Sequence, residues 1–219
     1  MPTQPLAIAR TSYAPASSAE PGPCDEIRLV GVTKSFGRDQ AIYGEGEPAD
    51  LVYKVISGGV RTFRVLADGR RQISEFHLPG DVFGVELDAE RRSGAEAICE
   101  SVLVVARRSA VTEDPAQGQR FWRHALRQLR RCQDQALTLG RRSASERVAS
   151  FLLDLAQRLG SGDELALPMS RQDMADYLGL TIETVSRTVT QMQGGGLIEL
   201  AGCRHVRLKR PGALAELCE

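Results

Sequence analysis

The spacing of the apolar residues changes once along this chain of 219 residues, between Arg108 and Asp114. Before this point, short runs such as Val60–Val65 alternate apolar and polar side chains, which is the period of a half-buried strand. After it, apolar residues recur every three or four positions through Arg120–Leu139, which contains no Gly or Pro. Strands followed by helices predict an α+β chain.

The N-terminal half is predicted to be a small antiparallel β-roll spanning residues 26–112. Four short runs have strand character, and glycine-containing turns separate them: Leu51–Ile56, Val60–Val65, Gln72–His77 and Ser101–Ala106. Asp68-Gly69 lies between two of these runs and is typical of a hairpin turn. Residues 1–25 are rich in Ala, Ser and Pro, and they are expected to form a flexible arm.

Residues 113–140 are predicted to form one long helix that pairs with a second copy of the chain. Ala125, Leu129, Cys132 and Ala136 follow one another at spacings of four, three and four, which gives a narrow apolar seam with a coiled-coil period. Five arginines flank this seam against a single Asp134. A narrow seam on a basic helix suits a homodimer better than burial in a core, although an ordinary packed helix is the alternative.

Residues 141–219 are predicted to form a winged helix-turn-helix. Ser143 and Glu146 fit a capping box at the start of one helix, and Ser170 with Asp173 begins another. Gly179 then interrupts the pattern before Thr181 starts a further helix, as in a helix-turn-helix. Two short strands after Gly196 complete a wing, with Arg204 and His205 near its tip.

The second helix of this motif carries polar residues on the half that enters a DNA major groove. Arg pairs with guanine and Glu accepts from cytosine, so Glu183 and Arg187, four positions apart, are candidate base-reading residues. The alternative is an ion pair on a solvated helix, worth only about 0.2–0.5 kcal/mol. The full candidate DNA-binding set is Ser170, Arg171, Gln172, Thr181, Ile182, Glu183, Thr184, Ser186, Arg187, Arg204 and His205.

Charge is unevenly distributed although the chain is neutral overall. Residues 1–119 carry 13 Lys and Arg against 17 Asp and Glu (net −4), and residues 120–219 carry 15 against 11 (net +4). This places any contact with phosphate in the C-terminal half. Five scattered cysteines, no export signal and no long apolar run indicate a cytoplasmic protein without a membrane span.

Taken in order, these parts resemble the cyclic-AMP receptor protein/FNR (CRP/FNR) family of bacterial transcription regulators. Gly44–Glu47, Val55–Val60 and Leu78–Gly84 match the family roll in type and order, and Ser170–Gln193 matches its helix-turn-helix. Glu183-x-x-Ser186-Arg187 is similar to the motif of the FNR and FixK branches. The resemblance implies a homodimer on inverted repeats with TTGA-like half-sites, in which Arg187 reads guanine, Glu183 its cytosine and Ser186 the adjacent A·T pair. By the same resemblance, Arg171 and Gln172 lie near the DNA backbone and groove edge.

The sequence lacks features of the family members that sense oxygen or cyclic nucleotides, and this favours the FixK branch. Membership of that branch implies activation of microaerobic and nitrogen-fixation genes, with RNA polymerase as a partner. Cys24 alone stands where an iron–sulfur cluster needs several ligands. Gly84-x-Glu86 and Arg92-Ser93 resemble a cyclic-phosphate site only in part, and Glu96 is expected to repel a phosphate there. No cofactor or metal is therefore predicted. A roll gated by a small molecule is the alternative.

Two further hypotheses concern chemistry rather than DNA binding. A cupin-like enzyme would need clustered metal ligands, and the roll offers His77 alone, so no enzymatic activity is predicted. Cys203 lies beside Arg204 in the predicted wing, where a neighbouring cation lowers a thiol pKa and oxidation would disturb DNA contact. A free thiol without a role is the alternative for Cys203.

Overall fold

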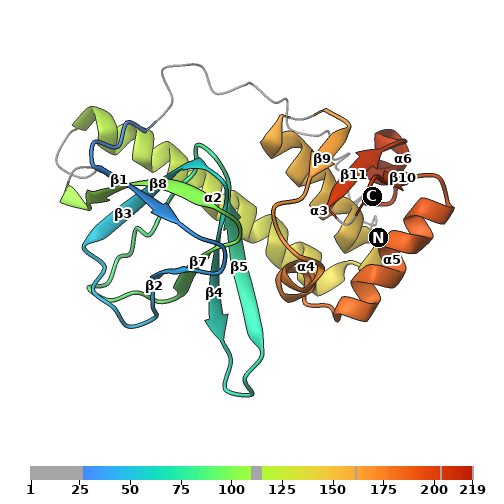
Figure 1. Cartoon of the computed structure of the whole chain (residues 1–219), viewed down its shortest axis with the longest axis horizontal. Helices are drawn as coiled ribbons and strands as arrows, with labels where there is room; N and C mark the ends of the chain where they lie inside the picture. The colour runs from blue at the N-terminus through green and yellow to red at the C-terminus, as the bar shows by residue number, and fades with distance from the viewer. Residues whose placement is uncertain (1–26, 110–114, 161, 203, 219) are drawn as a thin grey trace, which may run out of the picture.

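The computed structural model describes residues 27–109, 115–160, 162–202 and 204–218. Figure 1 shows a roll of strands on one side, a helical C-terminal unit on the other and a long helix connecting them. The predicted arm, residues 1–25, and the predicted boundary at 112–113 lie outside the described residues.

Two four-stranded antiparallel sheets make up the roll. One has the order β1 (Val32–Phe36), β8 (Ser101–Arg107), β3 (Leu51–Ser57), β6 (Val82–Phe83), and the other β2 (Ala41–Tyr43), β7 (Gly94–Ala97), β4 (Val60–Val65), β5 (Arg71–His77). The four predicted strands are confirmed as β3, β4, β5 and β8. Strand β1 was missed because it is an edge strand with only one partly buried side chain, so it has no alternating pattern.

The predicted hairpin turn is confirmed between β4 and β5. The Leu66 amide donates to the Arg70 carbonyl at 2.8 Å, and Gly69 has a φ of +82°. A left-handed φ is accessible to glycine without steric cost, so Asp68-Gly69 closes the hairpin tightly. The hairpin projects beyond the rest of the roll, and β5 lies beside α4 of the C-terminal unit (Figure 1).

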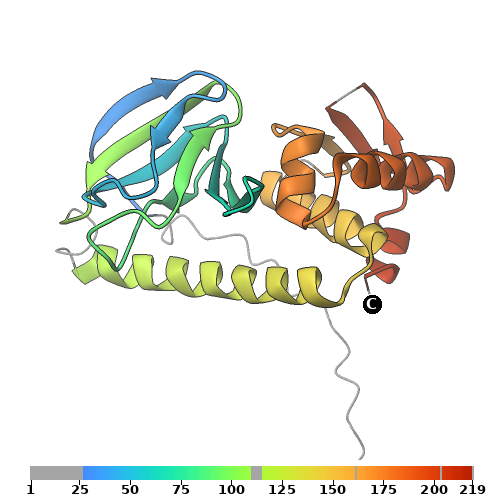
Figure 2. The ribbon, with the colours of Figure 1, turned by 90° about the horizontal axis from the view of Figure 1, so that it is seen from below.

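Helix α2 (Pro115–Arg141) runs alongside the roll and continues beneath the C-terminal unit (Figure 2). The sequence placed its end at Gly140, but the helix continues through Gly140 to Arg141. Its face toward the roll is anchored by Phe121, which packs against Val52 and Ala106, and by the His124 ring, whose Nε2 lies 2.9 Å from the Val82 carbonyl.

The C-terminal unit contains α3 (Ala144–Leu159), the helix pair α4 (Arg171–Leu178) and α5 (Ile182–Gly194), and a short α6 (Pro211–Glu216). Its sheet has the order β10 (Ile198–Leu200), β11 (His205–Leu208), β9 (Glu164–Ala166). The wing therefore has three strands where the sequence predicted two. The three residues of β9 are too few for a recognisable period, and they form a strand because they pair with β11.

One apolar core extends from the roll into the C-terminal unit. Phe76 of β5, Phe151 of α3 and Tyr177 of α4 have ring centroids 5.1–6.0 Å apart. Such spacing is that of interacting aromatic rings. The helix-turn-helix is consequently packed directly on the roll rather than tethered to it by α2 alone.

Candidate nucleic-acid interface

The two helices of the helix-turn-helix begin and end at capping residues that can be recognised in the sequence. The Asp173 amide donates to Ser170 Oγ at 3.0 Å, and the Ser170 amide donates to the Asp173 carboxylate at 3.0 Å, so the predicted capping box of α4 is confirmed. Gly179 ends α4 with a φ of +62°. Thr181 Oγ1 then accepts from the Thr184 amide at 3.2 Å and starts α5.

Helix α5 buries one face and presents the other to solvent. Val185, Thr188, Val189 and Met192 are buried against the core, whereas Thr181, Ile182, Glu183, Ser186 and Arg187 are exposed, with Thr184 half-buried at the margin. We call the six residues Thr181–Thr184, Ser186 and Arg187 the reading surface. It lies on the N-terminal half of α5, which is the part that enters a major groove in this motif.

Glu183 and Arg187 do not form an ion pair in the described part of the chain, so the alternative of a solvated i,i+4 pair is not what the structure shows. The pKa of Glu183 is lowered by hydrogen bonds from its own backbone amide and from Thr181 and by the charge of Arg187. Both side chains are exposed and available to a partner.

The remaining candidate residues surround this surface. Gln172 on α4 is exposed, and its amide donates to Asp176 Oδ1 at 2.6 Å, while Arg171 is half-buried. In the wing, the His205 side chain is exposed, and its backbone lies opposite that of Ala166 where β11 pairs with β9. The neighbouring Arg204 is half-buried. Cys203, the candidate for redox control, lies outside the described residues.

A groove of about 820 Å³ brings α4, α5 and the roll together. Its walls include Gln172 and Thr181–Thr184 on one side and Leu66, Arg70 and Arg71 of the β4–β5 hairpin on the other. The sequence did not associate the hairpin with the reading surface, because more than a hundred residues separate them. The wing residues Arg204 and His205 do not line this groove.

The outer face of α2 is apolar, as the predicted seam requires. Leu129 is 54% exposed, and Cys132 and Ala136 are also exposed, whereas Ala125 is half-buried. Sequence reasoning missed three exposed members of the same face: Trp122, Leu126 and Leu137. The spacing of Trp122, Leu126 and Leu129, at four and then three, is itself a coiled-coil signal that would have extended the seam.

Beside Gly84, the interior of the roll is occupied by aromatic side chains and a buried arginine. Tyr43, Tyr53 and Phe83 have ring centroids 5.2–6.3 Å apart. The buried Arg91 guanidinium lies 4.2 Å from the Tyr43 centroid and donates to the carbonyls of Gly84 and Leu51. A cation over an aromatic face is stabilised when desolvated. Any ligand that approached Gly84 would therefore meet Arg91 and the tyrosines.

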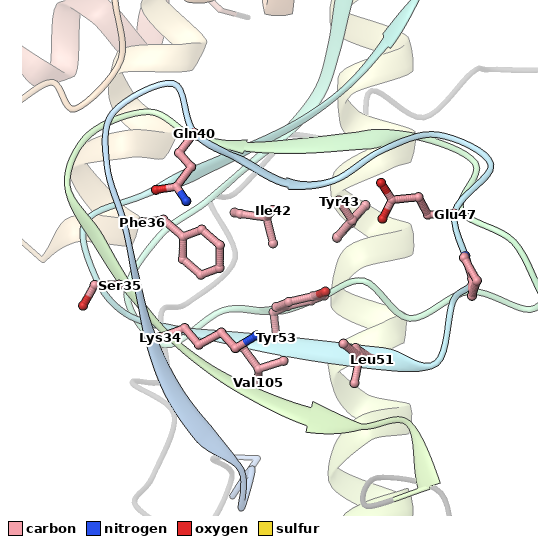
Figure 3. A pocket seen from close by; sticks show the side chains of 11 residues that line it. Lys34, Ser35, Phe36, Gln40, Ile42, Tyr43, Glu47, Leu51, Tyr53 and Val105 are labelled. Carbon is pink, nitrogen blue, oxygen red and sulfur yellow. The ribbon is translucent and has the colours of Figure 1, made fainter.

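Two of the residues that resemble a cyclic-phosphate site are in contact, because the Arg92 amide donates to Glu86 Oε1 at 3.4 Å, but the Arg92 side chain points to solvent. Arg92 is 78% exposed and pairs with Asp88 at 2.8 Å. The expectation that Glu96 repels a phosphate inside the roll is wrong, because Glu96 points to the face of β7 opposite the buried Ala95 and pairs with Arg61 at that outer face. Figure 3 shows a separate pocket of about 480 Å³, lined by Lys34, Phe36, Ile42 and Tyr53 among others and by none of these residues.

Within the described residues, no group of three or more His, Cys, Asp and Glu side chains is arranged to hold a metal ion. His77 is buried, stacks on Phe83 at 4.6 Å between centroids and has its Nε2 3.2 Å from Thr62 Oγ1. Burial lowers the pKa of His77 to about 3, so the ring is neutral and serves as a core residue. No described helix is long and apolar enough to cross a membrane.

A roll, a long helix and a winged helix-turn-helix with an exposed polar reading surface define a DNA-binding transcription regulator. Residues 146–217 match the Crp-like helix-turn-helix domain, and residues 33–113 match the cyclic nucleotide-binding domain. The chain belongs to the CRP/FNR family, in its FixK branch.

The similar proteins include FixK regulators and a transcriptional activator. The nitrogen fixation regulation protein FixK of Rhizobium meliloti (strain 1021) is 46% identical over 90% of this chain and 91% of its own. The transcriptional activatory protein AadR of Rhodopseudomonas palustris is 40% identical over 91% of this chain and 89% of its own. The structure of FixK2 from Bradyrhizobium japonicum superposes with a TM-score of 0.83 at 44% identity, covering 87% of this chain and 98% of that one.

Proposed function

We propose that this regulator binds, as a homodimer, an inverted repeat with TTGA-like half-sites and activates microaerobic and nitrogen-fixation genes in the cytoplasm. The observation that carries the proposal is the reading surface, in which Glu183 and Arg187 are exposed at the start of a capped helix and form no ion pair with each other. The names of the FixK and AadR relatives support the target genes and activation, and they favour a regulator over an enzyme.

Each residue of the reading surface has a role that its chemistry supports. Arg187 donates two hydrogen bonds to guanine O6 and N7, and Glu183 accepts from N4 of the paired cytosine. Ser186 lies between them and contacts the adjacent A·T pair, with Ile182 and Thr184 beside it. Ser170, Arg171, Gln172, Thr181, Arg204 and His205 contact the DNA backbone and groove edges, which position the protein without specifying sequence.

The outer face of α2 is the proposed dimer surface. Four large apolar side chains are 48–66% exposed there, whereas single exposed apolar residues are the rule on monomers. Pairing this face with a second copy, through Ala125, Leu129, Cys132 and Ala136 together with Trp122, Leu126 and Leu137, removes it from water. Two reading surfaces would then enter successive major grooves about 34–36 Å apart.

The roll is packed beside Gly84 without a ligand, because Arg91 and the tyrosines lie against one another there. This favours a regulator without a bound cofactor over one gated by a cyclic nucleotide. The turn Ala67–Arg71 at the tip of the β4–β5 hairpin, in which residues 67–70 are exposed, offers a surface for RNA polymerase.

Fluorescence anisotropy with a duplex containing TTGA-N6-TCAA, in air and without cyclic nucleotide, tests the proposal against a scrambled duplex. Selective binding without any additive supports it. Binding that requires a ligand or the removal of oxygen would contradict the ligand-free roll and favour the gated alternative.

Sedimentation equilibrium tests the dimer surface separately. Leu129→Glu introduces a charge into the outer face of α2 and is expected to give a monomer that binds the full duplex at least 100-fold more weakly. Leu87→Glu is the matched control, because Leu87 is fully exposed on the roll. A Leu129→Glu protein that remained a dimer would exclude this face.

A further inference from the structure

Charged residues from the roll and from the helix-turn-helix meet at a buried junction. Arg61 Nη1 on β4 and Arg71 Nη2 on β5 both donate to Asp173 Oδ1 of α4, at 3.0 and 2.7 Å. Arg71 Nε also donates to Asp176 Oδ2, one turn further along α4, at 2.8 Å. We call these four residues the α4 clamp.

Burial makes the clamp sensitive to geometry. The side chains of Arg61 and Asp173 are 7% and 5% exposed, and that of Asp176 is 13% exposed. Ion pairs in water contribute little and tolerate movement, but a buried pair must keep its geometry or leave an uncompensated charge. The planar fork of arginine adds direction, since its donors point along fixed lines toward two carboxylates.

Asp173 performs two tasks with its two oxygens. Oδ2 accepts from the Ser170 amide and hydroxyl at 3.0 and 2.7 Å and so starts α4, while Oδ1 accepts from both arginines. Asp173 therefore both caps the N-terminus of α4 and accepts hydrogen bonds from the two arginines of the roll. Rotation of α4 on the roll would break the arginine contacts at the base of the helix-turn-helix.

The clamp continues toward the DNA-binding side. Asp176 holds the Arg71 guanidinium with Oδ2 and the exposed amide of Gln172 with Oδ1, at 2.6 Å. Behind the clamp, Arg61 is held in turn by Glu96 and Asp39. A chain of charged and polar contacts thus leads from the sheet of the roll to the edge of the reading surface.

Beyond the clamp, the hairpin and the N-terminus of α5 are separated by the groove of about 820 Å³. Figure 1 shows β5 beside α4, with α5 on the far side of α4 from the roll. The roll consequently positions α5 through α4 and leaves the reading surface open.

We propose that Arg71 is a positioning residue that, with Arg61, sets the angle of the reading surface on the roll and thereby the spacing between half-sites that the dimer accepts. This inference rests on the proposed function, because it concerns the same DNA site. Each base pair added between half-sites moves one of them about 3.4 Å along the axis and rotates it by about 34°. A rigid clamp rejects such a change, whereas a loosened helix-turn-helix adapts to it.

The test measures anisotropy with TTGA and TCAA half-sites separated by five, six or seven base pairs, and with a duplex containing one half-site. The wild type is expected to lose at least 100-fold in affinity when the spacer departs from its optimum. Arg71→Ala is expected to bind the optimal duplex about tenfold more weakly but to lose less than tenfold on the others, with unchanged affinity for the single half-site. Arg64→Ala is the matched control, since Arg64 is an exposed arginine of β4 that pairs only with Glu45 among the described residues.

Asp176→Ala removes one of the two carboxylates to which Arg71 donates hydrogen bonds, leaves the contact between Arg71 and Asp173, and keeps the cap of α4. It is the milder variant and replaces Arg71→Ala if that protein fails to fold. If the clamp acts as proposed, Asp176→Ala relaxes the spacer preference in the same direction as Arg71→Ala but less, and adding Asp176→Ala to Arg71→Ala changes little. Retention of the wild-type spacer preference in both variants would overturn the inference. If the wild type fails to prefer TTGA over a scrambled duplex, the proposed function itself is wrong, and that outcome is visible before any variant is compared.

Discussion

Helices α4 and α5 belong to one motif and are joined by a short turn, yet they place their charged residues in opposite environments. On α5, Glu183 and Arg187 are exposed and do not pair with each other. On α4, Asp173 and Asp176 are largely buried and held by arginines of the roll. Under the two proposals above, the charged residues of α5 contact DNA and those of α4 fix the position of α5 on the roll.

The difference shows how to separate a charge that stabilises from one that recognises. An exposed unpaired charge adds little to folding, and its loss should appear only when DNA binds. A buried paired charge has the opposite property, because removing its partner leaves it unsatisfied in the native state. Variants on the two helices should consequently affect different measurements.

Arg61→Ala should have the largest effect on stability. It leaves the buried carboxylate of Asp173 without one of its two cations and is expected to reduce the free energy of unfolding by about 3–5 kcal/mol. Arg64→Ala, on the same strand but with a side chain 62% exposed, should cost about 0.2–1 kcal/mol. Urea denaturation measures both. Equal losses would mean that burial does not distinguish the clamp from the surface.

Arg187→Ala should show the reverse pattern. Without the donors to guanine, the variant is expected to lose about 1–3 kcal/mol of discrimination, roughly 5- to 150-fold, between TTGA and TTAA half-sites. Its free energy of unfolding should stay within about 0.5 kcal/mol of the wild type, because the side chain is exposed. Arg207→Ala in the wing, where Arg207 pairs with Glu164, is a control that should affect both duplexes equally. Unchanged discrimination in Arg187→Ala would remove Arg187 from base reading.

The caps and the turn that place α4 and α5 could be predicted from the sequence, but the clamp could not. Caps and turns involve residues three or four positions apart, so Ser170, Asp173, Gly179 and Thr181 could be assigned from their spacing alone. Arg61 and Asp173 are 112 positions apart, and nothing near either residue indicates the other. Long-range ion pairs depend on how the roll and the helices pack together, and the order of residues does not contain that information locally.

Helix α2 illustrates an intermediate case. Its seam was predicted to pair with a second copy of the chain, and Leu129, Cys132 and Ala136 are exposed. Arg131, which the sequence assigned to a flank of the seam, lies 3.6 Å from Glu75 of the roll. The period identified the apolar face, but the polar face also packs against protein, and only the folded structure shows which arginines are used there.

That polar face is part of a second buried charged cluster, where Glu75 and Asp81 of the roll meet Arg131 of α2 and Arg158 of α3. Arg158 Nη2 donates to Asp81 at 2.8 Å. Burial raises the pKa of Glu75 to about 7, against the pull of the two arginines, while Arg158 helps to hold the pKa of Asp81 below its usual value. If the charges of this cluster are coupled to folding, as those of the clamp are expected to be, the free energy of unfolding should change as Glu75 ionises.

Glu75→Gln tests this with the smallest expected effect. Since the pKa of Glu75 is about 7 in the folded state, against 4.5 for an unperturbed glutamate, its stabilising contribution is full below about pH 4.5 and is lost as the pH rises through 7. Relative to the wild type, the variant should gain on the order of 2 kcal/mol between pH 5.5 and 8. His77, whose pKa is lowered, is present in both proteins and cancels in this difference. Urea denaturation at the two pH values measures it, and a constant difference would show that the Glu75 carboxylate ionises as freely as one on the reading surface.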